Sequence, residues 1–142
     1  MDKITRINEQ IYLGPEDIAR RPGYLKDLGI QHIFNFADEV VYHIPHHMGF
    51  HIHYYPIKHD EDASLLGVLD DAIQSIYNCV SQQKCVYLHC TDGNSRAAAL
   101  AIYYLMLYEH MNFDDALGYL EELRPQINLH PNFVQELRAI GS

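Results

Sequence analysis

The sequence predicts a single α/β domain over residues 1–142, with a central, mostly parallel sheet flanked by helices. Short strand-like runs alternate with segments of helical periodicity, as in proteins whose parallel strands are joined by helices. The C-terminal half is helical by the same pattern. A hydrophobic share of 48% in 142 residues is enough for one core, and no repeat or linker marks a second domain.

Four apolar runs predict the strands of this sheet. Residues 10–14 (QIYLG) predict a short edge strand that a Gly-Pro turn ends. A helical turn that ends at Gly29 precedes a buried strand at residues 30–37 (IQHIFNFA). Two further runs, HIHYYPI at residues 51–57 and CVYLH at residues 85–89, complete the predicted sheet.

Two helices are predicted beside the last of these strands. The first begins with Asp62 or Ser64 as its N-cap and ends near Val80. Its apolar residues at helical spacing are Leu65, Leu66, Leu69, Ile73, Ile76, Tyr77 and Val80. The second covers residues 97–110 and is apolar nearly all round, which is typical of a buried central helix.

Two amphipathic helices are predicted towards the C-terminus. Asn112 begins the first as its N-cap, with Asp115 at the third helical position, and Arg124-Pro125 ends it. Pro131 opens the second. The apolar residues of this last helix are Phe133, Val134, Leu137 and Ile140.

Composition limits the function classes. The formal net charge of −9 and the pI of about 5.4 argue against binding to nucleic acid, which requires a basic surface, and less strongly against binding to anionic membranes. We see no signal peptide in MDKITRINEQ and no membrane span, so we expect no membrane anchor. Three cysteines, Cys79, Cys85 and Cys90, form no disulfide framework, so we expect the protein in the cytoplasm, or also in the nucleus.

The segment from Cys90 to Arg96 joins a predicted strand to a predicted helix. The N–H groups of such a loop can turn inward, and the helix N-terminus adds a partial positive charge, so the loop can hold an anion. Gly93 is free to adopt positive φ, and Arg96 can grip two phosphate oxygens. We therefore expect a phosphate site here.

Cys90 lies at the base of this expected site. The dipoles that hold a phosphate also favour a thiolate, which can attack the phosphorus and form a phosphocysteine that water later cleaves. The ring of His89 could orient the backbone of Cys90. The alternative interpretation makes Cys90 a buried small apolar residue and Arg96 a surface residue, but their position between an apolar strand and an apolar helix favours the phosphate site.

These residues resemble the signature of the cysteine-dependent dual-specificity protein tyrosine phosphatases (VH1-like), in which His-Cys is followed by five residues and Arg. The matching stretch here is VYLHCTDGNSRA. The resemblance covers nearly the whole chain, because IYLGPEDIARRPGYLKDLGIQHIFNFADE, YYPIKHDEDASLL and YYLMLYEHMNFDDALGYLEELRPQINLHPNF are similar to segments of this family in the same order. It implies a protein tyrosine phosphatase-like fold.

The resemblance also implies a role for each matched residue. Cys90 would be the nucleophile and Arg96 the phosphate clamp, with His89 in support. Asp60 would be the general acid, which protonates the leaving oxygen, and its neighbours Glu61 and Asp62 are alternatives. The loop amides that would bind phosphate belong to Thr91, Asp92, Gly93, Asn94, Ser95 and Arg96. The reaction would need no metal or other cofactor.

Two positions depart from the family pattern. Ala97 stands where the family usually has Ser or Thr, whose hydroxyl stabilises the departing thiolate in the second step. Loss of that hydrogen bond slows the step roughly ten- to a hundredfold, so we expect slow hydrolysis of the phosphocysteine. Asp92 stands where the family more often has Ala, and we expect it to point outward and to bond the loop backbone or a neighbouring side chain.

The expected substrate is a phosphoprotein carrying phosphotyrosine, phosphoserine or phosphothreonine. The chain lacks room for the segments that deepen the pocket of classical tyrosine phosphatases, which favours dual specificity. Two alternatives are a phosphate-binding pseudophosphatase without turnover and a phosphatase for a lipid or glycan phosphoester. The presence of Cys90, Gly93, Arg96 and Asp60 together argues against the first.

The remaining histidines and cysteines carry weaker signals. Histidines crowd residues 43–59, but their spacing matches no structural zinc pattern and no cysteine lies among them, so we expect no metal site. These histidines are His43, His46, His47, His51, His53 and His59. Of them, His59 could modulate its neighbour Asp60. Cys79 or Cys85 could trap an oxidised Cys90 as a disulfide, but plain core roles are favoured.

Overall fold

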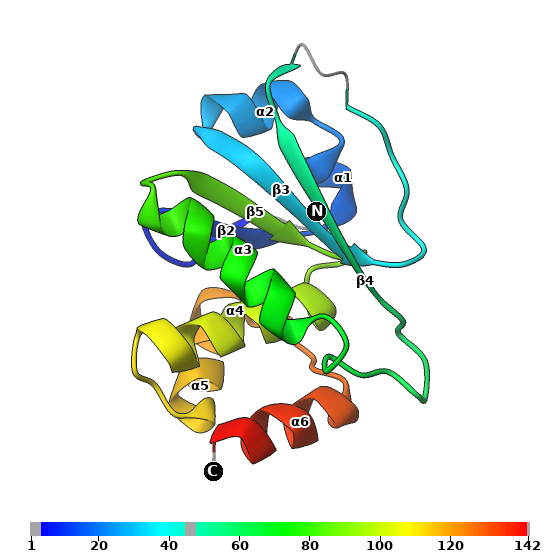
Figure 1. The fold of residues 1–142 in the computed structure, drawn as a ribbon, viewed down its shortest axis with the longest axis vertical. Coiled ribbons are helices and arrows are strands. Elements are labelled where there is room, and N and C mark those ends of the chain that lie inside the picture. Colours follow the sequence, from blue (N-terminus) through cyan, green and yellow to red (C-terminus); the bar gives the residue numbers. More distant parts are fainter. Residues whose placement is uncertain (1–3, 45–47, 142) are drawn as a thin grey trace.

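A five-stranded sheet forms the centre of the computed structural model, which describes residues 4–44 and 48–141 (Figure 1). The strands, in the order β1-β2-β5-β3-β4 across the sheet, are β1 (Thr5–Arg6), β2 (Ile11–Gly14), β5 (Cys85–His89), β3 (Ile30–Ala37) and β4 (His51–Ile57). All neighbouring strands are parallel except β1 and β2. The predicted fold class is confirmed, and β3, β4 and β5 have their predicted bounds.

The strand β2 begins one residue later than predicted and is not at the edge of the sheet. It was predicted as an edge strand, but the two residues of β1 pair with it in antiparallel orientation, so β1 is the edge. A strand of only two residues has no periodicity that a sequence pattern could show.

Helices cover both faces of the sheet (Figure 1). One face carries α1 (Glu16–Ala19) and α2 (Pro22–Asp27), and the other carries α3 (Leu69–Ser81) and α4 (Arg96–Tyr108). The last two helices, α5 (Phe113–Leu123) and α6 (Pro131–Gly141), pack against α4 on the side away from the sheet. Among the helices of residues 4–44 and 48–141, none has the length and apolar character needed to cross a membrane.

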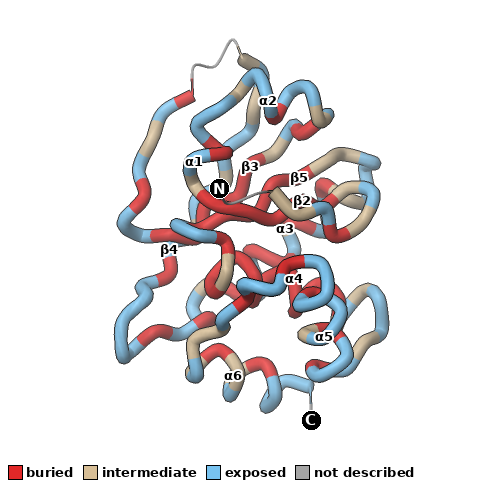
Figure 2. The backbone as a smooth tube through the Cα atoms, turned by 180° about the vertical axis from the view of Figure 1, so that it is seen from behind, coloured by how far each residue is buried: buried red, intermediate tan, exposed pale blue. Residues whose placement is uncertain are grey.

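Alternation along the strands divides the core between the two faces. Ile33 and Tyr87 pack with α1 and α2, whereas their neighbours Phe34 and Leu88 pack with α3 and α4. The central strands and α4 are the most continuously buried parts of the chain (Figure 2). Residues 97–105 of α4 are all buried, as predicted for a helix that is apolar nearly all round.

The helix α3 begins later than predicted. Neither Asp62 nor Ser64 is its N-cap, because the helix starts at Leu69 and residues 65–68 form a turn. Glu136 of α6 accepts hydrogen bonds from Ser64 Oγ at 2.5 Å and from the Leu65 amide at 2.8 Å. A residue far away in the sequence thus binds this segment, which forms a turn before the helix begins.

The two C-terminal helices agree with their predictions. The side chain of Asn112 caps α5 by accepting a hydrogen bond from the Asp115 amide at 2.8 Å. Pro131 is the first residue of α6, where its missing N–H group has no helical partner to lose.

Strand register aligns the carboxyl ends of the parallel strands. His89, the last residue of β5, pairs with Gly14 of β2 and with Asn35 of β3. The segments that follow these strands therefore meet at one edge of the sheet, where ligands bind in open α/β proteins. The loop that begins at Cys90 lies at this edge.

Candidate active site

The loop from Cys90 to Ser95 connects β5 to the N-terminus of α4 and packs tightly against the end of β2. Gly93 has φ of +80°, and a Cβ atom there would lie 2.5 Å from the carbonyl group of Gly14. No other residue fits this position, because the backbone of Gly14 cannot yield as a flexible side chain could. Cys90 is 1% exposed at the start of the loop.

The carbonyl groups of this loop are held by donors that surround it. Cys90 O accepts from the His89 ring at 3.0 Å, and Thr91 O accepts from the Glu16 amide at 3.0 Å. Two further pairs are Asp92 O with Arg124 Nη2 at 2.8 Å, and Asn94 O with the Asn128 amide at 2.9 Å. Ser95 O accepts from the Ala99 amide at 2.8 Å, within α4. We infer that these carbonyls point away from the centre of the loop.

The orientation of the carbonyls fixes the orientation of the amides. In a trans peptide the N–H group of one residue points opposite to the C=O group of the residue before it. We infer that the amides that follow the held carbonyls point into the loop. They belong to Thr91, Asp92, Gly93, Ser95 and Arg96. With the N-terminus of α4 behind them, these donors suit an oxyanion.

The amide of Asn94 has a different partner. It donates to Oδ1 of Asp92 at 2.9 Å, so this amide of the predicted set already has an acceptor inside the loop. The side chain of Asp92 thus bonds the loop backbone, which is one of the two contacts expected for it. The carboxylate occupies a donor that a phosphate would otherwise use.

Glu39, just after the end of β3, holds Arg96 by its guanidinium. Its Nη1 and Nη2 atoms lie 2.6 Å and 2.7 Å from the two carboxylate oxygens of Glu39. Nη1 also donates to the carbonyl of Ile57 at 2.9 Å, and Nη2 reaches the hydroxyl of Thr91 at 3.3 Å. Within the described residues, Nε–H and this weakly held Nη2–H are the donors left for phosphate oxygens. The side chain of Arg96 is 4% exposed and that of Glu39 is 51% exposed, so the ion pair joins a buried guanidinium to a carboxylate at the surface.

The position of Glu39 was not predicted from the sequence. The hydrogen bonds from Arg96 hold the pKa of this carboxyl well below its usual range, so it is ionised at neutral pH. A second acid, Asp38, lies 3.4 Å from Nη1 of Arg96. The signal available in the sequence is that both acids directly follow a predicted buried strand, at the edge where the loop of Cys90 also lies.

His89 makes the contact that was expected of its ring. Its Nδ1 lies 3.0 Å from the carbonyl oxygen of Cys90, which can only accept, so Nδ1 carries the proton. Its Nε2 therefore accepts from the hydroxyl of Tyr42 at 2.7 Å. Burial lowers the pKa of His89 to about 4 and raises that of Tyr42. A neutral imidazole with one fixed tautomer thus supports the backbone of Cys90.

Asp60 lies on the exposed loop that follows β4. Ile57, the last residue of β4, binds Arg96 through its carbonyl, so this loop starts at the site. The ring of His130 lies 2.7 Å from the carbonyl of Asp60, and the amide of His130 donates to the hydroxyl of Ser95 at 3.0 Å. His130 therefore links the loop that carries the expected acid to the loop that carries the expected nucleophile.

The residues on either side of Asp60 also lie near the candidate site. Glu61 and Asp62 are exposed, and the amide of Asp62 donates to Oδ1 of Asp60 at 2.9 Å. Burial, followed by the positive charges of Arg96 and His130, lowers the pKa of His59. His59 is thus close enough to sense the charge of the site.

The other histidines and cysteines lie elsewhere. His46 and His47 are outside the described residues. Cys85 begins β5 and Cys90 follows its end, about 16 Å away for five extended residues, whereas a disulfide needs Cα atoms within about 7 Å. Cys79 lies beside His32, at the other end of the sheet. Neither cysteine is placed to trap an oxidised Cys90.

The proteins that this chain resembles in sequence are phosphatases. A model of the family described as dual specificity phosphatase, catalytic domain, matches residues 11–142. Protein phosphatase Slingshot of Drosophila melanogaster is 32% identical over 140 residues, which cover 98% of this chain and 13% of that protein. The chain spans 13–27% of the lengths of this and two further curated relatives.

Two solved structures share the fold. The crystal structure of human DUSP28 has a TM-score of 0.87 and 21% identity, and the match covers 97% of this chain and 92% of that one. Human tyrosine phosphatase-like serine/threonine/tyrosine-interacting protein has a TM-score of 0.87 and 24% identity, with 96% and 94% covered. At these identities the likeness concerns the fold alone.

We predict that Asp92→Ala strengthens binding of inorganic phosphate by roughly two- to tenfold, because it frees the Asn94 amide and removes a negative charge. Competitive inhibition of aryl phosphate hydrolysis measures this affinity. Asp92→Asn, which keeps an acceptor oxygen without the charge, separates the two causes. An unchanged or weaker inhibition by phosphate in Asp92→Ala would contradict the prediction.

We also predict a pH-dependent stability that depends on His89. The pKa of His89 is about 4 in the folded state and near 6.5 when unfolded, so below pH 6.5 the unfolded state gains a proton first and the folded state loses stability until about pH 4. Between pH 7 and pH 5 the free energy of unfolding should fall by about 2 kcal/mol more in wild type than in His89→Asn. Urea titrations at both pH values measure it, and parallel losses in the two proteins would refute it.

Proposed function

Because this chain belongs to the dual specificity phosphatase family, we propose that it hydrolyses phosphotyrosine and phosphoserine or phosphothreonine in proteins through a phosphocysteine intermediate. The observation that carries the proposal is the loop of Cys90, whose amides point inward beside a fixed Arg96. These donors match the three oxygens of a phosphate monoester. The reaction needs no metal or other cofactor, and the chain acts as one catalytic domain.

In the first step, the substrate phosphate binds to the loop amides and to Arg96. The thiolate of Cys90 attacks phosphorus in line with the ester oxygen, so the S–P bond forms as the P–O bond breaks. The departing oxygen takes a proton from the carboxylic acid of Asp60. The amides lower the energy of the transition state because they are oriented before the substrate arrives.

In the second step, water replaces the leaving alcohol or phenol. The carboxylate of Asp60 removes a proton from the water as the water attacks phosphorus, and the S–P bond breaks. Cys90 returns as a thiolate, and inorganic phosphate leaves. Here the hydroxyl that usually stabilises the thiolate in this family is missing, because the residue after Arg96 is the fully buried Ala97.

A phosphate-binding module without turnover is the rival function. The fold alone does not separate the two, because one protein of this fold is named a phosphatase-like interacting protein. The residues separate them, since this chain keeps a cysteine at the base of the loop and an acid on the loop after β4. These two residues are needed for bond breaking and are dispensable for binding.

Two accompanying proposals concern context. We propose that the protein works in the reducing cytoplasm, or also in the nucleus, which its free cysteines Cys79, Cys85 and Cys90 support. We also propose phosphoproteins as its partners, with no role for nucleic acid, which the net charge of −9 supports.

We predict that wild type hydrolyses aryl phosphates and that Cys90→Ser abolishes turnover while keeping phosphate affinity.

Asp60→Asn should slow hydrolysis of phenyl or alkyl phosphates by roughly a hundredfold or more. It should slow hydrolysis of phosphates with good leaving groups much less, because only poor leaving groups need the proton. Glu61→Gln and Asp62→Asn are the matched controls. A wild type no faster than Cys90→Ser, with phosphopeptide still bound, would establish the rival function.

We further predict that the second step limits the rate. Rapid mixing with an aryl phosphate should release a burst of phenol equal to the enzyme concentration, followed by a slower steady rate. Ala97→Ser should raise the steady rate by up to roughly tenfold and diminish the burst, because it restores the hydroxyl that stabilises the leaving thiolate. A linear time course that this substitution leaves unchanged would reject the prediction.

A further inference from the structure

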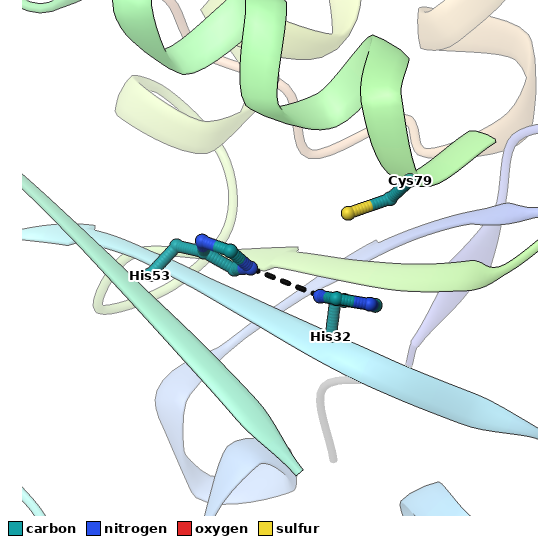
Figure 3. A group of neighbouring side chains, drawn as sticks. All are labelled: His32, His53 and Cys79. Atoms are coloured by element: carbon teal, nitrogen blue, oxygen red, sulfur yellow. Dashed lines mark hydrogen bonds between the residues drawn. The ribbon is translucent and has the colours of Figure 1, made fainter. Parts of the chain in front are cut away.

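We propose that His32, His53 and Cys79 form a binding site for one Zn²⁺ ion, at the end of the sheet opposite the loop of Cys90 (Figure 3). From the sequence no metal is expected here, because the histidines of residues 43–59 have no cysteine near them in the chain. The fold supplies that cysteine from α3 and a further histidine from β3. The proposal does not depend on the proposed phosphatase function.

Strand register brings the histidines together. In the parallel pairing of β3 with β4, His32 is the partner of His51 and Phe34 is the partner of His53. Side chains at alternate positions of a strand share a face, so the three histidines point towards the layer that contains α3. Cys79, in the last turns of α3, points at them from that layer (Figure 3).

The distances between the donor atoms are close to those of a metal centre. One ligand atom from each of the three residues lies within 4.8 Å of the others, and Nδ1 of His32 is 2.9 Å from Nε2 of His53. Two nitrogens bound to one tetrahedral zinc at about 2.0–2.1 Å are roughly 3.4 Å apart. The nitrogens therefore need to separate by about half an ångström and turn towards a shared ion, and Sγ of Cys79, which lies within 4.8 Å of them, needs to be about 3.5 Å from each.

Two of the three side chains have groups that no other contact uses within residues 4–44 and 48–141. The Nε2 atom of His32 is buried and has no hydrogen-bond partner among the described residues. Cys79 is a free, buried cysteine. In the proposed site Nδ1 of His32 is the ligand, so the ion replaces its hydrogen bond with His53 and is shared with the free thiol, while Nε2 carries the proton.

Ring stacking holds the histidines in place before any ion binds. The ring of His53 lies between those of His32 and Phe34, with centroid distances of 5.2 Å and 4.3 Å. The ring of His51 also stacks with that of His32, at a centroid distance of 4.8 Å. A site with ligands that are already oriented loses less conformational entropy when it binds an ion.

The donor set selects the class of ion. Two imidazoles and one thiolate suit Zn²⁺, which prefers nitrogen and sulfur in tetrahedral sites, and they do not suit Mg²⁺ or Ca²⁺, which prefer oxygen. Binding displaces the thiol proton of Cys79 into solvent, and each histidine keeps one N–H group. A water molecule would complete the tetrahedral coordination. The ion would join β3, β4 and α3.

Metal titration of the full chain tests the proposal. We expect one Zn²⁺ per chain in competition with a chromophoric chelator, and Co²⁺ should give a thiolate-to-metal absorption band. Cys79→Ser should remove this band and weaken zinc affinity at least tenfold, and His53→Ala should weaken it similarly. Saturating Zn²⁺ should raise the melting temperature of wild type by roughly 5–10 °C and leave that of Cys79→Ser unchanged.

Matched variants control for other cysteines and histidines. Cys85→Ser, Cys90→Ser and His110→Ala should keep the cobalt band and the zinc affinity. Circular dichroism without metal checks that Cys79→Ser is folded. If this variant does not fold, the cobalt spectrum of wild type still tests the proposal. Absence of a thiolate band in wild type, or its loss in Cys90→Ser or Cys85→Ser with retention in Cys79→Ser, would overturn the proposal.

Discussion

Hydrogen bonds hold the carbonyl groups of the loop after β5 on the outer side of that loop. The candidate site depends on the constraint that these bonds impose. Without them the loop would present a mixture of donors and acceptors to an incoming anion. The donors come from places far apart in the chain, namely the start of α1, the end of α5 and the segment before α6. The part of the chain after α4 therefore contributes to the site although it supplies none of the expected catalytic groups.

Arg124 shows this dependence best. It follows α5, is 1% exposed, and binds both the carbonyl of Asp92 and the side chain of Asn94. A buried arginine is costly unless its donors are satisfied, and here the acceptors are loop atoms that must point outward. Glu39 plays the corresponding role for Arg96. In both cases a contact with a buried guanidinium fixes the direction of a group that would face phosphate.

Sequence patterns predict the parts of this protein that depend on local residues. The strands β3, β4 and β5 are apolar runs between turn residues, and Asn112 caps a helix through an amide three residues away. The start of α3 is different, because Glu136 of a distant helix binds Ser64 and Leu65. Local periodicity cannot show such a contact.

The residues of the candidate site also divide into those that the local sequence predicts and those that only the fold brings together. Cys90, Gly93 and Arg96 lie in one short segment, so their spacing alone indicates a phosphate loop. Tyr42 contacts His89 next to that loop, and His130 contacts Ser95 within it, because the fold brings together residues that are far apart in the sequence. The proposed metal site is a further example, since its three ligands come from three separate elements.

The central claim is that Cys90 carries the phosphoryl group during turnover. The most direct measurement is acid quenching of the reaction with an aryl phosphate, followed by mass spectrometry of the peptide that contains this residue. The account predicts a phosphoryl adduct on Cys90 during turnover, at a level that falls in Ala97→Ser. Turnover without any adduct on Cys90, or with the adduct on another residue, would contradict it.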